Sequence, residues 1–313
     1  WLTLRGSYAT GLQPPTPNLL IPSETEYDRA FQPDPKRGND FFVDEGTYLE
    51  RQAGNPDLKA IEASTLSLGM VLNPFGDRAP RVSFDYSRII THGEPFAPLS
   101  VLEHEDIWPE RVIREPLTEE DRALGYTAGR ILVIDSSVAN AGRSTIETLD
   151  ALLDWRVPVF GGTLRTYGAA TWQIGNTLTE PAAPAQQRVG FARSPVEWRA
   201  NAGFDFTRGP LALGANLQYV GRYRAYQYDT EILAPDFIAV QGSAWVAAQV
   251  YLDLYASRRF RVAGTEASVD LGIVNVFDQA PAFEADPYST GHGYSMYGDP
   301  RRRRLEVVLS AEF

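Results

Sequence analysis

Side chains that carry out chemistry are few in this sequence and lie far apart. The histidines are His92, His104 and His292, and there is no cysteine. The run 103–106 (EHED) brings carboxylates and an imidazole close together, as a metal site requires. Other acidic residues surround it, a pattern more typical of a solvated charged loop. The motifs G-x-S-x-G, H-E-x-x-H and the P-loop do not occur in the sequence. We therefore predict no enzyme, no metal and no cofactor.

Ligand binding is better supported than catalysis, because charged and aromatic residues gather in or next to long connections between predicted strands. Loops on a rigid scaffold commonly carry recognition. The candidate ligand contacts are Arg222, Arg224, His92, Tyr288 and Tyr294.

Two charged stretches have a second interpretation as binding surfaces. Residues 24–57 carry nine acidic residues against four basic ones, which is typical of an exposed soluble loop but also suits cationic ligands or bridging divalent ions. The run 301–304 is four arginines, and guanidinium groups bind phosphate oxygens well.

Composition excludes several classes of protein. The chain has 313 residues, a net charge of −11 and a mean hydropathy of −0.26. The negative charge argues against a nucleic-acid partner, and the lack of cysteine excludes a disulfide framework. The longest apolar runs are far too short for a membrane-spanning helix, although β-barrel strands need only about 9–11 residues.

Ten segments alternate between apolar and polar residues with a period of two, which predicts antiparallel strands with one apolar and one polar face. The last, RRRRLEVVLSAEF, has apolar residues at every second position back from Phe313. The predicted strands are residues 1–11, 62–73, 81–90, 148–157, 163–176, 196–207, 211–224, 244–256, 267–277 and 303–313.

The connections between these segments are alternately long and short. Short examples are PVFGG and RGP, whereas the long ones reach about fifty residues. Within one long connection, PLTEEDRALGY predicts a short helix capped by Thr118 and ended by Gly125. Transmembrane barrels have short periplasmic turns and long extracellular loops, so the pattern predicts such a barrel.

Aromatic residues provide an independent indication of a membrane. By strand direction, Trp172, Trp198 and Trp245 fall at the outer interface, and Trp155, Phe204 and Phe206 at the inner one. Two aromatic belts are typical of a protein in a bilayer. The polar face is predicted to hold Arg5, Arg165, Arg199, Arg222 and Arg224 together with Asp85, Asp150, Asp154, Asp205 and Glu197.

Four stretches, in this order and spacing, resemble the C-terminal half of the barrel of TonB-dependent outer-membrane receptors. The first two, LRGSYATGLQPPT and GNPDLK, are similar to the family's R-x-S-Y-x-x-G-F-x-x-P and G-N-P-x-L segments. NAGRSTIETLDALLDW resembles its N…G-I-D-x-x-L pattern, with Thr148 in place of the usual glycine. The fourth, VNVFDQAP followed by the final strand, resembles N-L-F-D-x-x-P and the terminal phenylalanine.

The resemblance implies a bacterial outer-membrane protein importing a scarce solute through a twenty-two-stranded barrel. Residues 1–313 would be an all-β wall of about ten antiparallel strands, the last ten of the barrel. The implied partners are an N-terminal plug and barrel half outside this sequence, the TonB complex acting through the plug, outer-membrane lipid and lipopolysaccharide, and the assembly machinery, which would read Phe313. The sequence begins inside a strand pattern, so we expect it to be part of a longer chain.

Two other functions remain open from the sequence. One is a passive outer-membrane barrel or porin, in which these ten strands close on themselves. The other is a soluble β-sandwich that binds or processes carbohydrate, which would not explain the alternation of loop lengths. Neither the substrate nor the oligomeric state is encoded in a recognisable motif.

Overall fold

A computed structural model describes most of the chain. The described residues are 1–21, 25–30, 34–38, 47–74, 76, 79–96, 101–102, 105–180, 185–227, 234–262, 264–286 and 293–312. Among them, no helix combines the length and the apolar character needed to cross a membrane.

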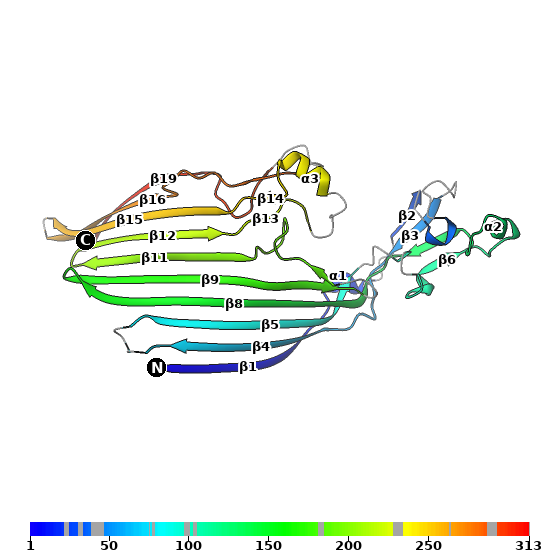
Figure 1. Cartoon of the computed structure of the whole chain (residues 1–313), viewed down its shortest axis with the longest axis horizontal. Coiled ribbons are helices and arrows are strands. Elements are labelled where there is room, and N and C mark those ends of the chain that lie inside the picture. The colour runs from blue at the N-terminus through cyan, green and yellow to red at the C-terminus, as the bar shows by residue number, and fades with distance from the viewer. Residues whose placement is uncertain are drawn as a thin grey trace.

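One large antiparallel sheet dominates the molecule, and its long strands lie side by side in chain order (Figure 1). Its order is β1 (Leu2–Gln13), β4 (Ile61–Leu72), β5 (Arg81–Phe96), β8 (Ala139–Val159), β9 (Gly162–Thr179), β11 (Trp198–Arg208), β12 (Leu211–Val220), β15 (Gln249–Val262), β16 (Thr265–Val274) and β19 (Arg304–Glu312). A two-residue strand, β10 (Gln186–Gln187), is added to β9. These ten strands confirm the predicted wall.

Short turns and long loops are sorted to opposite ends of the sheet, as predicted (Figure 1). Phe160 and Gly161 connect β8 to β9, and both have positive φ angles, 51° and 71°. Gly209 makes the β11–β12 turn with a φ of 52°. Two-residue turns of this kind match the twist of the strands they connect.

The strand register confirms the assignment of the two faces. One row across six strands is apolar throughout: Leu164, Phe206, Leu213, Ala256, Leu271 and Val307. The next row is polar or small: Arg165, Asp205, Gly214, Tyr255, Gly272 and Glu306. We call the two sides of the sheet the apolar face and the polar face.

The sheet does not close on itself. Among the described residues, β1 pairs only with β4, and β19 pairs only with β16. The closed ten-stranded barrel that the sequence left open is therefore wrong.

Several strands differ in extent from the prediction. β5 and β8 pair as far as Phe96 and Ala139, well beyond the predicted ends, because a hydroxyl contact between Thr91 and Ser144 (2.7 Å) continues the polar pattern between them. β12 ends at Val220, where the chain turns into a separate hairpin of β13 (Tyr223–Arg224) and β14 (Trp245–Val246). The prediction for 244–256 was early by five residues, since β15 begins at Gln249. Trp245 therefore lies in a loop hairpin and not in the wall.

The first two long loops fold together beyond the long-loop end of the sheet (Figure 1). Their strands form a second sheet in the order β2 (Thr25–Ala30), β3 (Thr47–Gln52), β7 (Ile131–Asp135) and β6 (Val112–Arg114), with β3 and β7 parallel. The short helices α1 (Pro17–Leu20), η1 (Pro35–Arg37), η3 (Pro109–Arg111) and α2 (Glu119–Ala123) accompany it. We call the described residues of 14–60 and 97–138 the loop module.

The other long loops form a second cluster, the loop cap, which consists of the described residues of 180–197, 221–248 and 275–303. It contains β13, β14, α3 (Ala234–Gln241), β17 (Phe283–Glu284) and β18 (Gly293–Tyr294). The buried hydrophobic clusters lie largely in the loop module and the loop cap. This distribution follows from the architecture, because the wall exposes both of its faces.

Candidate functional site

The polar face carries ion pairs that link strands of the wall. Arg5 on β1 donates to both oxygens of Asp85 on β5, with Nη2–O distances of 2.7 Å, across the intervening strand β4. Arg165 donates to Asp154 (Nε–Oδ2 2.7 Å) and lies 3.6 Å from Asp205. The predicted polar interior is confirmed for these residues, and its charges largely compensate each other.

Glycines make room for the large groups on this face. A Cβ on Gly214 would lie 2.2 Å from the Tyr255 ring, and one on Gly203 would lie 2.5 Å from the Tyr167 hydroxyl. The Tyr255 hydroxyl donates to Asp205. Each tyrosine therefore occupies the space that a side chain on the neighbouring glycine would need.

The loop cap is built around Tyr223, which is 1% exposed. Its hydroxyl donates to Glu284 and lies 2.8 Å from the hydroxyl of Ser295, and Gln249 Nε2 donates to the same Ser295 oxygen (2.8 Å). Burial, then the contact with Glu284, raises the pKa of Tyr223 above its usual value. The phenol therefore stays protonated and holds β17 and β18 against β13.

Arg222 and Arg224 flank Tyr223 and lie over one indole ring. Their guanidinium carbons are 4.5 and 4.2 Å from the centroid of the Trp245 ring. Stacking fixes the orientation of the guanidinium groups, which then offer their N–H donors to a ligand. The structure thus brings together two of the predicted contact residues and adds Trp245, which we had assigned to the membrane interface. We call Arg222, Arg224 and Trp245 the arginine platform.

The other predicted contacts are not joined to this platform. Tyr294 lies on β18 opposite Phe283 and is 62% exposed. His92 is exposed on β5 opposite Glu62 and Arg143, and the alternation places it on the face of Phe84. Tyr288 and Phe313 lie outside the described residues.

A buried ion network holds the loop module together. Arg114 on β6 lies between two carboxylates, 2.5 Å from Asp34 and 2.8 Å from Glu105, and Lys36 lies 3.0 Å from Glu105. Asp34 and Glu105 are 4% and 8% exposed. Burial acts to raise the pKa of Glu105, but the hydrogen bonds from Arg114 and Lys36 outweigh it and hold that pKa below its usual value. Glu105 is therefore a structural ion-pair partner. The prediction that it belongs to a solvated charged loop is wrong for this residue.

A second buried pair anchors the predicted helix. Thr118 and Asp121 form a reciprocal capping box at the start of α2, and Gly125 follows with a φ of 82°, as predicted. Arg37, which is 4% exposed, donates to Asp121 (2.8 Å) and lies over the ring of Tyr126. The backbone N–H of Thr118, followed by Arg37, lowers the pKa of Asp121 to about 2. No sequence motif indicated the pair of Arg37 and Asp121, because the two residues are 84 positions apart.

The loops are fastened to the wall by asparagines of the motifs noted in the sequence. Asn140 accepts from the Lys59 N–H (2.7 Å) and donates to the Gly93 carbonyl (2.6 Å). Asn275 has a φ of 55° and exchanges hydrogen bonds with the backbone of Gln279. Asn140 and Asn275, which belong to two of the four family-like stretches, thus fix the points where loops meet strands.

Three of the four arginines in the run 301–304 are paired with acidic residues of the chain. Arg301 and Arg304 contact Asp299, and Arg302 contacts Asp278 (3.1 Å). The bond from Arg301 holds the pKa of Asp299 far below its usual value. These pairs close the base of the last loop, and contact of the run with lipopolysaccharide stays a prediction. Among the described residues, no group of three or more histidine, aspartate or glutamate side chains is arranged to hold a metal.

Comparisons with known proteins agree on one family. The family model described as TonB dependent receptor-like, beta-barrel, matches residues 1–276. No curated protein sequence matches the chain closely enough to count as a relative.

Solved structures of similar fold are outer-membrane receptors. The siderophore receptor PirA from Acinetobacter baumannii superposes with a TM-score of 0.61 at 15% identity, covering 99% of this chain and 39% of that one. A mutant of the ferric enterobactin receptor PfeA from Pseudomonas aeruginosa gives 0.60 at 14%, covering 99% and 38%. BauA, the ferric preacinetobactin receptor from Acinetobacter baumannii, gives 0.51 at 12%, covering 100% and 34%. The chain thus spans little more than a third of these receptors, and at such identities the likeness shows the fold alone.

Proposed function

The chain belongs to the family of TonB-dependent receptor β-barrels of the bacterial outer membrane, and from this we propose that it forms wall and loops of an importer for a scarce solute. Import would be driven by TonB acting through a plug inside the barrel. Residues 1–313 would be one part of the barrel domain. The family is one of receptors and transporters and not of enzymes.

The observation that carries the proposal is the combination of an ion-paired polar face with folded loops at one end. An open channel needs no organised loops, whereas a receptor needs a rigid recognition surface before the solute reaches the lumen. The loop module and the loop cap are both held by buried polar contacts, Arg114 with Glu105 in one and Tyr223 with Ser295 in the other.

We further propose that the solute is an anionic metal chelate such as a ferric siderophore. The arginine platform supports this class, because Arg222 and Arg224 have no acidic partner among the described residues and are oriented by Trp245. Oriented guanidinium groups bind anionic oxygens, and the indole ring suits an aromatic group of a chelator. Of the three solved receptors of similar fold named above, PirA is a siderophore receptor, and PfeA and BauA are receptors for ferric enterobactin and ferric preacinetobactin.

The test is saturable binding and uptake of radiolabelled ferric chelates by cells that express the intact receptor in a strain lacking its own. Replacing both arginines (Arg222→Gln with Arg224→Gln) should weaken binding roughly tenfold per residue, because each loses a charge-assisted hydrogen bond. Arg122→Gln is the matched control, since this exposed arginine pairs with Glu119 within α2.

Uptake that rises linearly with external concentration, without saturation, would support the passive channel instead. Saturable uptake that the double variant leaves unchanged would retain the importer and remove the arginine platform from recognition.

A further inference from the structure

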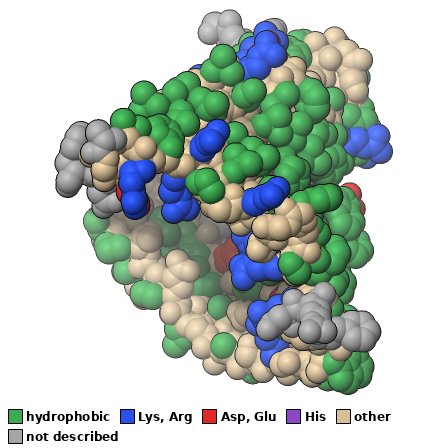
Figure 2. Space-filling model, turned by 90° about the vertical axis from the view of Figure 1, so that its left-hand side faces the viewer, with side chains coloured by type: hydrophobic (Ala, Val, Ile, Leu, Met, Phe, Trp, Pro, Cys, Tyr) green, Lys and Arg blue, Asp and Glu red, His purple; other side chains and the backbone are tan. Residues whose placement is uncertain are grey.

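The short-turn end of the wall carries many arginines although the chain as a whole is acidic. Figure 2 shows this end, where Lys and Arg side chains recur and few acidic ones are visible. The arginines on the strands near these turns include Arg81, Arg156, Arg208, Arg258, Arg259 and Arg261. In this family's orientation the short turns are periplasmic, so these residues lie at the level of the inner leaflet.

Two of these arginines lie on the apolar face. The register places Arg208, Leu211, Arg258, Val269 and Leu309 in one row, two residues from the apolar row that contains Leu213. Arg208 and Arg258 are exposed and have no acidic partner among the described residues. They are thus unpaired cations on the surface that faces lipid.

Aromatic and apolar side chains surround the two arginines. On the same face lie Phe206 and Phe260, and Phe160 at the β8–β9 turn is 86% exposed. Arg208 extends over that turn, because a Cβ on Gly161 would lie 3.7 Å from its Nε. An arginine on the lipid-facing side is costly in the middle of a bilayer and tolerated at the interface, where its long side chain reaches the headgroups.

We propose that Arg208 and Arg258 form a binding site for the phosphate of an anionic glycerophospholipid in the inner leaflet. Guanidinium groups bind phosphate oxygens through paired N–H donors, and the aromatic side chains nearby would contact the acyl chains. One strand, β12, separates the two arginines, so their backbones are about 10 Å apart. The Arg208 side chain lies over the β8–β9 turn, on the side of β11 away from β12, so it would turn back toward β12 to share one headgroup with Arg258.

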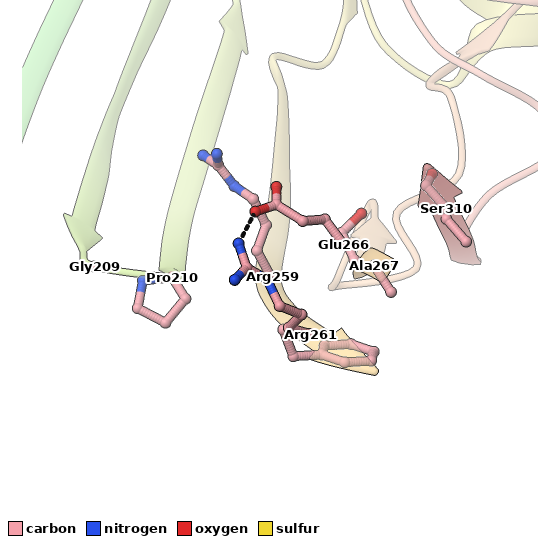
Figure 3. Close-up of a pocket in the computed structure, with 10 residues that line it drawn as sticks. Gly209, Pro210, Arg259, Arg261, Glu266, Ala267 and Ser310 are labelled. Carbon is pink, nitrogen blue, oxygen red and sulfur yellow. Dashed lines mark hydrogen bonds and ion pairs between the residues drawn. The ribbon is translucent and has the colours of Figure 1, made fainter. Parts of the chain in front are cut away.

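Arg259 provides an internal control, because it is next to Arg258 but on the other face. Arg259 is among the residues that line a pocket of about 680 Å³ at the short-turn end of the wall, where Arg261 pairs with Glu266 (2.8 Å). Figure 3 draws these residues. Arg259 also lacks an acidic partner among the described residues. The two residues therefore differ mainly in which face they occupy.

The experiment measures phosphatidylglycerol binding to the intact receptor in detergent by native mass spectrometry. Arg208→Gln and Arg258→Gln should each weaken binding about fivefold, and together about twenty-five-fold, as expected for two cations at a lipid surface. Arg259→Gln should leave it unchanged, and Arg258→Lys should keep most of it. The heat-shifted mobility of the folded barrel on a gel confirms that each variant is assembled.

Phosphatidylcholine and inorganic phosphate test whether a net anionic headgroup with its acyl chains is required, and both should bind far more weakly. Equal losses in Arg259→Gln and Arg258→Gln would overturn the site, as would unchanged binding in the double variant. Binding of lipid A that is lost in the same two variants would overturn the assignment to the inner leaflet.

Discussion

Three charged groups from distant parts of the chain meet inside the loop module, where Arg114 separates Asp34 from Glu105. Salt bridges on a surface contribute little to stability, but breaking a buried one leaves an uncompensated charge. The side chains here are between 5% and 10% exposed. The loop module therefore depends on single charges more than the wall does.

Removing Arg114 should unfold the loop module without disturbing the wall. Arg114→Met leaves the buried Asp34 without its cation and Glu105 with Lys36 alone, so the loop module should lose ~3–5 kcal/mol of stability. Hydrogen exchange at the amides of β3 and β7 measures the loss, with β9 as the internal reference. Arg122→Met, which removes an exposed pair, should change it by less than about 1 kcal/mol. Unchanged protection after Arg114→Met would contradict the network.

Acid should open the loop module for the same reason. The pKa of Asp121 is lowered to about 2, and that of Glu105 is also below its usual value. The unfolded loop module therefore binds more protons, so these groups stabilise the folded form above about pH 4 and lose that effect as pH falls toward 2. Hydrogen exchange of β3 and β7 between pH 5 and 2.5 should show protection falling. In the double variant Asp121→Asn with Glu105→Gln, protection should fall less between pH 5 and 2.5. An equally steep fall in that variant would mean that other groups cause the acid response.

The wall strands were predictable because each strand has one face toward lipid and one toward the polar side, so apolar and polar residues alternate along it. Leu217 on the apolar face and Gln218 on the polar face follow this pattern, and Gln218 donates to Asp253 (3.1 Å) on the next strand. The ends of the strands were less predictable. β12 stops at Val220 although the alternation continues to Arg224, because Gly221 then donates to the carbonyl of Trp198 and the chain turns into the loop cap.

Adjacent residues on β12 should differ sharply in their tolerance of a charge. Leu217→Arg places a cation in lipid near the middle of the strand and should cost ~2–4 kcal/mol, whereas Gln218→Arg places it beside Asp253 and should cost far less. Urea unfolding of the intact receptor in liposomes, followed by tryptophan fluorescence, gives both values. Equal costs would mean that the register of β12 is shifted by one residue.

Glycines on the polar face set a second condition on the strands. Gly214→Val should reduce the yield of assembled barrel, because its Cβ would overlap the Tyr255 ring. Combining it with Tyr255→Ala should restore part of the yield, as measured by heat-shifted mobility on gels. Failure of the second change to help would mean that another neighbour of Gly214 causes the defect.

The molecule as a whole is an open wall with two organised loop assemblies at one end. The wall, its faces and its turns followed from the sequence pattern. The arginine platform did so in part, since Arg222 and Arg224 were predicted but Trp245 was assigned to the bilayer. The loop module was not predictable, because its contacts join loops that are separated by two strands of the wall and have no periodic pattern.

Loops grafted from a relative should fold only in pairs. The sheet of the loop module takes β2 and β3 from the first long loop and β6 and β7 from the second. Exchanging residues 14–60 together with 97–138 should give a folded receptor with the donor's ligand preference. Either exchange alone should leave the loop module open to protease on intact cells. A single exchange that remains protected would contradict the shared fold.

Energy coupling separates an importer from a passive barrel most directly. The measurement compares binding and uptake of a radiolabelled ferric chelate in cells that carry the intact receptor, with and without TonB. We expect surface binding to be the same in both strains, and accumulation inside the cell to be abolished without TonB. Undiminished accumulation without TonB would contradict the account.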